Sequence, residues 1–354
     1  MEFKKTNIGN IIIDNEFSIN GNSFTISIND NYDTINCKSL SNVRLLANLD
    51  KIKNVSEYYN TFFNCLNISG SIDYTALIGK KKSKKYLLYL KEKINETMPM
   101  ISTYHTEIFP KRLECYSQLK QVKLRSSILK VPKYTHSGVT GRTSIRSGFN
   151  FLTMKKDERK HIKPLDPEYD LYEVDFKSCE PFFFLKSTGK SIDSRDVYSW
   201  LKNKYDIRID DRDKIKRGIL SMIYGANVST TSRIMKISKS KVENIKDDMG
   251  ITLLYDRLTK EYEEFGFIKN YYGRPITSDN NLVNYWIQSS TVDFCSLAFL
   301  EFYKNNSIEP CFFIHDSMTF QIKKGDIAKV LCIDSFLDSY SGIKIPVEFS
   351  KITI

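Results

Sequence analysis

The sequence lacks the features of a secreted, zinc-stapled or membrane-spanning protein. Its seven cysteines occur singly, with no CxxC pair and no histidine at zinc-ligand spacing, which argues against a disulfide framework and a structural zinc site. No apolar run approaches the ~18 residues of a membrane span, and the first residues lack the apolar core of a signal peptide. There is also no internal repeat and no long linker. These absences predict a soluble, cytoplasmic protein with reduced thiols.

The composition is that of a globular protein with an excess of positive charge. The chain has 354 residues, 41% of them hydrophobic and 27% charged, which is enough for two or three substructures around a large core. Its 53 Lys and Arg outnumber 42 Asp and Glu, so the formal net charge is +11. Since each neutralised phosphate releases counterions, this excess favours a nucleic acid over an acidic membrane as partner.

Hydrophobic periodicity predicts an α+β fold. Residues 1–35 alternate around the turn signal Asn20-Gly21-Asn22, which predicts a β-hairpin, and residues 38–130 have the three- and four-residue spacing of helices. Beyond 130 we expect a Gly-rich loop at 138–148, strands near 149–154, 171–176 and 343–349, a hairpin at 311–322, and helices around 178–188, 194–206, 211–224, 240–265, 280–304 and 326–340.

A run of lysines marks a candidate nucleic-acid contact within the predicted helical region. Five like charges in six positions repel one another, so an interacting tip is favoured over a solvated helix tip once nucleic acid is suspected. The run consists of Lys80, Lys81, Lys82, Lys84 and Lys85.

Two aspartates lie at points where the predicted sheet ends. Asp175 closes the apolar strand that starts at Leu171, and on its own this position fits either a helix cap or a metal ligand. Asp316 lies at the tip of the hairpin predicted over 311–322. If adjacent strands bring the two carboxylates together they need cations between them, and two Mg²⁺ ions about 3.5–4 Å apart then serve phosphoryl transfer.

A third stretch supplies cations and an aromatic ring. Arg212 and Lys216 are four residues apart, and Tyr224 follows eight residues later, so one helix would present all three along one stripe. Such cations bind a triphosphate, and such a ring stacks on a base.

Together the three stretches resemble motifs A, B and C of the family A (Pol I-like) DNA polymerases over roughly residues 130–354. Asp175-Phe-Lys-Ser-Cys-Glu180 matches Asp-Tyr-Ser-x-x-Glu; Arg212, Lys216, Tyr224 and Gly225 match Arg-x3-Lys-x7-Tyr-Gly; and His315-Asp316-Ser317 matches His-Asp-Glu except at its last residue. Thr140-Gly-Arg142 with Asn150 resembles the duplex-binding loop, and Asn284-x3-Gln288-x4-Asp293 resembles a further family helix. Five matches in the family's order are a specific signal.

The resemblance implies a role for each matched residue. Asp175, Asp316 and the carbonyl of Phe176 would hold two Mg²⁺ ions, with Mn²⁺ as a substitute. Arg212 and Lys216 would hold the incoming triphosphate, Tyr224 would stack at the nascent pair, and Glu180 would exclude a 2′-hydroxyl. The primer–template would be contacted by Arg142, Asn150, Asn284, Gln288 and His315.

The family's right-hand architecture is the expected fold, with an antiparallel palm sheet and helical fingers and thumb. The expected parts are a β-rich segment at 1–37, a thumb-like region at 38–130, fingers at 191–279, and a palm formed by 131–190 and 280–354. The sequence departs from the family at Leu220, where an aromatic residue is usual, and at Asn280, where Arg is usual. The carboxylate patterns Asp14-Asn-Glu16 and Asn29–Asp33 are too close together to frame a proofreading exonuclease, and none is predicted.

The predicted activity is therefore template-directed addition of dNTPs to a primer by a monomeric, phage- or plasmid-type enzyme in the cytoplasm, or the host cytoplasm. A single-subunit RNA polymerase or a primer-synthesising enzyme is the nearest alternative, favoured by Ser317 and by the pair Lys216-Arg217 but opposed by Glu180. A catalytically silent DNA-binding module is the second alternative. Intact Asp175 and Asp316 argue against it, because binding alone has no use for paired metal carboxylates.

Overall fold

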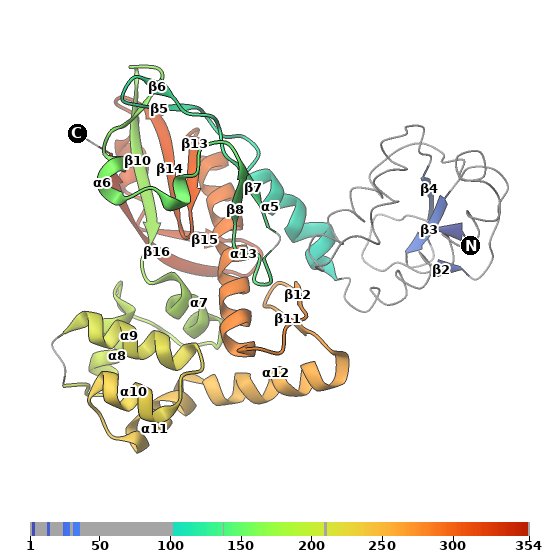
Figure 1. Ribbon diagram of the computed structural model, residues 1–354, viewed down its shortest axis with the longest axis vertical. Helices are drawn as coiled ribbons and strands as arrows, with labels where there is room; N and C mark the ends of the chain where they lie inside the picture. Colours follow the sequence, from blue (N-terminus) through green and yellow to red (C-terminus); the bar gives the residue numbers. More distant parts are fainter. Residues whose placement is uncertain are drawn as a thin grey trace. The chain divides into compact units, whose positions relative to one another are not determined.

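The computed structural model describes residues 102–136, 138–208 and 211–352, together with four short strands within residues 1–35 (Figure 1). The chain divides into two compact units, residues 1–110 with 272–275 and residues 111–271 with 276–354. The lysine run at 80–85 lies outside the described residues. The described elements of the first unit are β1 (Glu2–Phe3), β2 (Ile13–Asp14), β3 (Phe24–Ile28), β4 (Asn31–Ile35) and the π-helical turn η3 (Tyr104–Ile108).

The second unit contains the predicted functional stretches from Arg142 onward. Its elements, with α5 and β12 crossing the boundary between the units, are α5 (Phe109–Cys115), β5 (Val122–Leu124), β6 (Ser127–Ile128), β7 (Lys133–Thr135), β8 (Ser144–Ser147), η4 (Phe151–Thr153), α6 (Lys156–Arg159), β9 (Ile162–Pro164), β10 (Tyr169–Phe176), α7 (Cys179–Ser187), α8 (Val197–Lys204), α9 (Arg212–Ile223), α10 (Val228–Met235), α11 (Lys239–Met249), α12 (Ile251–Phe265), β11 (Ile268–Lys269), β12 (Pro275–Ile276), α13 (Leu282–Asn305), β13 (Glu309–Ile314), β14 (Ser317–Lys323), α14 (Ala328–Leu331), β15 (Ser335–Asp338) and β16 (Ile343–Lys351).

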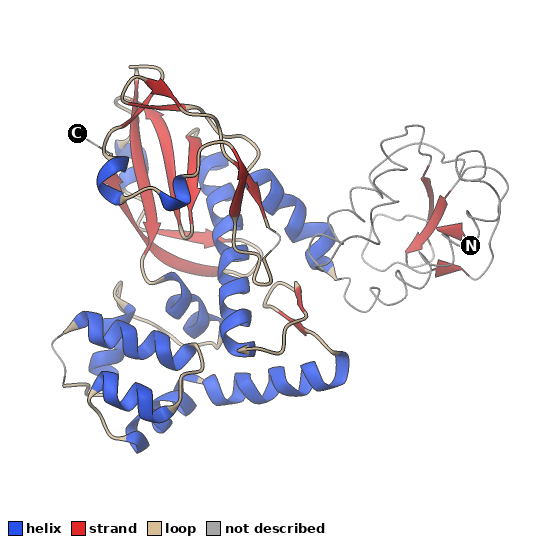
Figure 2. Cartoon of the chain, in the orientation of Figure 1, coloured by secondary structure: helices blue, strands red, loops and turns tan. Residues whose placement is uncertain are grey.

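A five-stranded antiparallel sheet in the order β13-β14-β10-β16-β15 forms the centre of this unit (Figure 2). Alternation along β10 gives the sheet two apolar faces, because successive side chains of a strand point to opposite sides. On one face Phe176 packs against Phe294 and Phe299 of the long helix α13. On the other face Leu171 joins a buried cluster with residues of β5, β9 and η4. Asp175 has the same parity as Leu171, so it lies on the face opposite α13.

Helices α8 to α12 follow one another below the sheet in the view of Figure 1, and α8 to α11 begin at side-chain caps. The side chains of Asp196, Asp211, Asn227 and Ser238 accept backbone N–H bonds at the starts of α8, α9, α10 and α11, which satisfies donors that have no partner within the helix. The predicted helix over 240–265 is two helices, because Gly250 adopts φ +84° and breaks it into α11 and α12.

Several other predictions of local structure were wrong. The predicted helix over 326–340 is only α14 followed by strand β15, whose Phe336 and Asp338 are buried in pairing with β16. The predicted strand over 149–154 is the 3₁₀ turn η4, which stacks Phe151 on Phe312 with ring centroids 3.9 Å apart.

The predicted boundaries of two further segments also differ. The predicted helical region to residue 130 ends in β5 and β6, and the Gly-rich stretch 138–148 contains β8. Near the N-terminus the alternation predicted a hairpin that turns at Asn20–Asn22. The described hairpin instead joins β3 to β4, so its turn lies after Ile28.

The coarse fold class agrees with the sequence. The structure combines helices with antiparallel sheets, as predicted, whereas the division into palm, fingers and thumb stays a prediction. Within the described part of the chain, none of the helices has the length and apolar character that crossing a bilayer requires.

Candidate active site

The ends of β10 and of the β13–β14 hairpin bring the two predicted metal aspartates together. In the register of the sheet Asp175 is opposite Ser317 on β14 and opposite Glu348 on β16. The backbone N–H of Phe176 donates to the carbonyl oxygen of Asp316 at 3.3 Å, which joins the strand end to the hairpin tip. His315 at that tip has φ +54°, a left-handed conformation that makes the tight turn possible.

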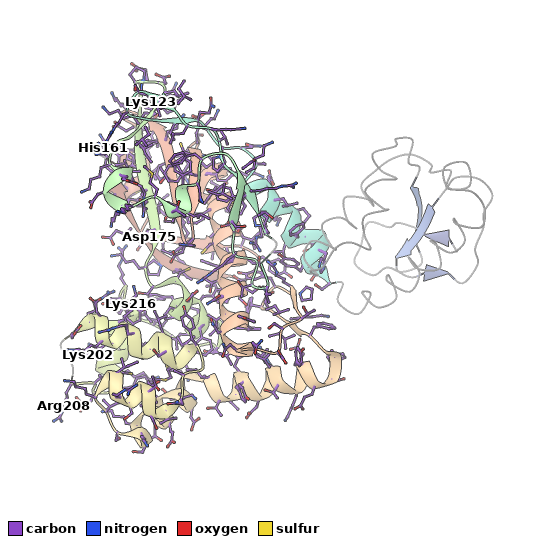
Figure 3. The ribbon with its side chains drawn as sticks, viewed as in Figure 1. Lys123, His161, Asp175, Lys202, Arg208 and Lys216 are labelled. Carbon is purple, nitrogen blue, oxygen red and sulfur yellow. The ribbon has the colours of Figure 1, made fainter. Side chains whose placement is uncertain are left out.

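Both aspartates open into a cleft of about 680 Å³ within the second unit. Figure 3 labels Asp175 at the end of β10 and Lys216 on α9, which come from different parts of the chain. Predicted site residues that line the cleft are Arg142, Asp175, Phe176, Glu180, Arg212, Lys216, His315 and Asp316. The cleft therefore combines carboxylates with cations that reach it from other elements.

Burial, and for Asp175 also the charge of neighbouring carboxylates, disfavours ionisation of the two aspartates in this cleft. Desolvation, followed by the charges of Asp316 and Glu173, raises the pKa of Asp175 to about 7. Burial likewise raises the pKa of Asp316, although the positive charges near it, including those of His315, Arg142 and Lys216, oppose the shift. Such acidic groups hold their negative charge at a cost unless a cation joins them.

These residues fit a magnesium site of the type that is completed by substrate. Mg²⁺ prefers oxygen ligands and commonly uses one or two carboxylates, with waters and substrate phosphates filling the remaining positions. Asp175 and Asp316 supply two carboxylates, and Glu348 also lines the cleft. Among the described residues no group of three or more His, Cys, Asp or Glu side chains forms a complete metal cage. The donor set thus suits a metal shared with a phosphate ligand rather than a structural metal.

Arg212 and Lys216 reach the cleft from the first turns of α9. Arg212 donates from Nε and Nη2 to the carboxylate of Asp196 at 3.2 and 3.1 Å, and its guanidinium lies 5.2 Å from the centre of the Tyr198 ring. Partial burial pushes the pKa of Asp196 upward, but hydrogen bonds from Arg212 and Ser199 outweigh it and the pKa lies below its ordinary value.

Sequence reasoning missed Asp196, although it lines the cleft. The same carboxylate accepts the backbone N–H of Tyr198 and caps α8. An aspartate just before a helical pattern is the usual signal for a cap, and it gives no indication of a second partner. Arg195, Lys177 and Glu348 are further charged lining residues that the sequence analysis did not single out.

Glu180 is held between two side chains of the predicted site. It receives a hydrogen bond from Arg142 Nη2 at 2.9 Å and one from the hydroxyl group of Tyr224, which is the residue at the end of α9. Burial raises the pKa of Glu180, and the positive charge of Arg142 opposes that shift. Tyr224 is not among the residues that line the cleft. Its hydroxyl group reaches the cleft-lining Glu180 through this hydrogen bond.

Three predicted DNA contacts lie outside the cleft lining. Asn150 is exposed just before η4, and Asn284 and Gln288 lie on the first turns of α13. The buried Oδ1 of Asn284 has no hydrogen-bond partner among the described residues. Thr291 and Val292, one turn further along α13, do line the cleft, so this helix extends from the cleft toward both amides.

A buried ion pair supports the loop that carries Arg142. Arg112 Nη1 lies 2.6 Å from Asp293 Oδ1, both side chains are fully buried, and Arg112 also donates to the carbonyl of Gly141. Asn270 donates to the other carboxylate oxygen of Asp293 at 2.7 Å. Asp293, which the sequence analysis noted only as a family match, is thus part of the scaffold behind the cleft.

Solved structures match this chain, and among them is a distant likeness to a polymerase domain. No family model and no curated protein matches the sequence. The polymerase domain of Pol1 from M. smegmatis, solved in complex with DNA primer-template and dNTP, is similar with a TM-score of 0.45 and 14% identity over 62% of this chain. The chain covers 47% of the length of that one.

Proposed function

We propose that this protein is a template-directed DNA polymerase that adds dNTPs to a primer 3′ end, with the type of chemistry used by family A polymerases. The observation that carries the proposal is the shared cleft of Asp175 and Asp316 with Arg212 and Lys216. Paired carboxylates and paired cations are the groups that nucleotidyl transfer from a triphosphate requires.

The carboxylates of Asp175 and Asp316, with the carbonyl of Phe176, would hold two Mg²⁺ ions, for which Mn²⁺ can substitute. When bound, the ions stabilise the negative charge that develops on the phosphoryl oxygens and on the attacking and leaving oxygens. Arg212 and Lys216 bind the triphosphate by charge, and this interaction favours release of pyrophosphate. The raised pKa of Asp175 supports this assignment, because perturbed carboxyl groups gather at catalytic sites.

Glu180 is the residue that selects the sugar in this proposal. Its carboxylate is fixed by Arg142 and by the hydroxyl of Tyr224, so it occupies one position in the cleft instead of moving aside. A fixed carboxylate leaves no room for an added 2′-hydroxyl, which supports DNA synthesis over RNA synthesis. Arg142 and His315 would contact the primer terminus from the same cleft, and Asn150, Asn284 and Gln288 would contact the duplex beyond it.

Primer extension tests the proposal directly. Wild-type protein with Mg²⁺ should extend a primed template with dNTPs, whereas Asp175→Ala and Asp316→Ala should each lower the rate by at least about a thousandfold, because each removes a metal-binding carboxylate. Asp279→Ala is the matched control, since it removes an exposed carboxylate away from the cleft lining. Its rate should stay at the wild-type level.

Each alternative has its own outcome in this assay. Preferential use of rNTPs would assign the site to an RNA polymerase or a primer-synthesising enzyme. Binding of the primed template without incorporation of either nucleotide type would leave a silent DNA-binding module.

A further inference from the structure

The excess positive charge of this chain is concentrated in one segment. Residues 120–163 contain twelve Lys and Arg but only Asp157 and Glu158 as acidic residues, whereas the whole chain has 53 cations and 42 acids. The rest of the molecule is therefore almost neutral. A net charge gathered in this way is a local electrostatic feature and not a general property of the composition.

Most of these cations are not used in ion pairs. Lys120, Arg142, Arg159 and Lys160 pair with acidic side chains. The other eight form no ion pair with any described residue, and all but the half-buried Lys123 are exposed: Lys123, Arg125, Lys130, Lys133, Arg146, Lys155, Lys156 and Lys163.

Two of them are placed where they weaken the fold. Lys123 on β5 and Lys163 on β9 are directly opposite in the antiparallel register. Their neighbours Val122 and Ile162 are buried in the core cluster, so the alternation directs both lysines to the outer face of this small sheet. Like charges directly opposite across two strands are destabilising. This outer face of β5 and β9, together with α6, is called the basic face below.

The basic face extends from the cleft along β10. Arg159 of α6 donates to Glu173 at 3.2 and 3.3 Å, and Glu173 lies two residues before Asp175 on β10. Beyond Glu173, Leu171 is covered by β5 and β9. In Figure 3 the labelled residues Asp175, His161 and Lys123 follow one another in this order up the view, away from Lys216.

We propose that the basic face binds the phosphate backbone of the duplex behind the primer terminus. This inference rests on the proposed function. Six residue steps of about 3.3 Å separate Asp175 from Tyr169, where β9 leads into β10, so the opposed lysines lie roughly 20 Å from the cleft. At about 3.4 Å per base pair this is about six base pairs. Phosphate oxygens there neutralise the two lysines that repel each other in the free protein.

The salt dependence of DNA binding tests this assignment. We expect Lys123→Gln/Lys163→Gln to weaken binding of a hairpin primer–template with a stem of about 12 base pairs by one to two orders of magnitude at about 0.1 M salt. The slope of log K against log salt should become less steep by about 1.8, since each phosphate contact contributes about 0.9. A hairpin with a stem of about 4 base pairs should bind both proteins equally. Lys239→Gln/Lys260→Gln removes two exposed lysines of α11 and α12 as the matched control.

Thermal unfolding provides a second measurement. If Lys163 instead stabilised the fold, Lys163→Glu would lower the unfolding temperature. Lys163→Glu should raise the unfolding temperature by converting a repulsive cross-strand pair into an attractive one, while it weakens binding of the long hairpin further. Suppose that the wild-type protein extends primers but the double variant has the wild-type salt slope. Duplex binding by the basic face would then be refuted, and the proposed function would stand. Absence of both binding and extension in the wild-type protein would instead refute the proposed function.

Discussion

The contacts of Asp196 indicate how the cleft would orient Arg212 toward a triphosphate. Arginine has five N–H donors in a rigid fork, and Asp196 uses two of them on one edge of Arg212. The other edge stays available for a phosphate, while Tyr198 supports the plane of the guanidinium. Because the carboxylate of Asp196 is itself fixed at the cap of α8, the pair orients Arg212 before a ligand arrives.

Asp196→Asn should therefore raise the apparent KM for dNTP several-fold and change kcat little. Asparagine caps helices as well as aspartate does, so α8 is retained while the ion pair is lost. Asp211→Asn is the matched control, because Asp211 caps α9 beside Arg212 but accepts hydrogen bonds from Asp213 and Lys214 instead. Steady-state kinetics of single-nucleotide addition separate the two variants. Equal KM values for Asp196→Asn and wild type would remove Asp196 from this role.

At the level of elements, α9 is positioned by close packing against α10. Gly218 faces Met235, and a methyl group at Gly218 would overlap the Met235 Cγ and lie 2.6 Å from its Sδ. Both residues are buried, so neither can move into solvent. The helix that carries Arg212 and Lys216 thus depends on a position without a side chain.

Gly218→Ala should destabilise the protein by about 1–2 kcal/mol, since overpacking outweighs the better helix propensity of alanine. Shortening the opposing side chain should restore part of this loss, so Gly218→Ala/Met235→Ala should be more stable than the two separate changes added together. Urea unfolding of the four proteins in this cycle measures the coupling. Additive effects would mean that the two helices separate enough to accept the methyl group.

The sequence predicted those elements that carry their own strong periodicity. The apolar alternation of β10 and of the hairpin containing Asp316 identified the strands that carry both aspartates, and α9 was found from its residue spacing. It did not predict β15 or β5, because strands of only four and three residues show little alternation of their own and depend on pairing with β16 and with β6 and β9. For the same reason the pair of Asp196 and Arg212 was missed, since the arrangement of α8 and α9 creates it.

At the scale of the whole molecule, the cleft and the basic face both place like charges together at a cost in stability. Two opposed lysines, Lys123 and Lys163, belong to the basic face. At least three acidic residues, Asp175, Asp316 and Glu348, line the cleft. A ligand with phosphates and metal ions offsets both costs when it binds. The free protein is therefore expected to have a lower free energy of unfolding than the same fold would have without these like charges.

This expectation can be measured at Asp175. Its pKa of about 7 in the folded protein lies above the ordinary value of 3.8, so the folded state binds the proton more tightly than the unfolded state does. Ionisation of Asp175 consequently lowers the free energy of unfolding as the pH rises from about 4 to about 7, and the loss is constant above that range. Asp175→Asn, which carries no charge, should be more stable than wild type at pH 8 by about 1–2 kcal/mol, because it removes an ionised group that burial and the charges of Asp316 and Glu173 disfavour. Solvent in the cleft screens part of this cost and limits the gain. Denaturant unfolding in a chelating buffer, with Asp279→Asn as the control, should show this gain at pH 8 and none near pH 4. A gain that stayed the same at both pH values would mean that the substitution acts through packing and not through charge.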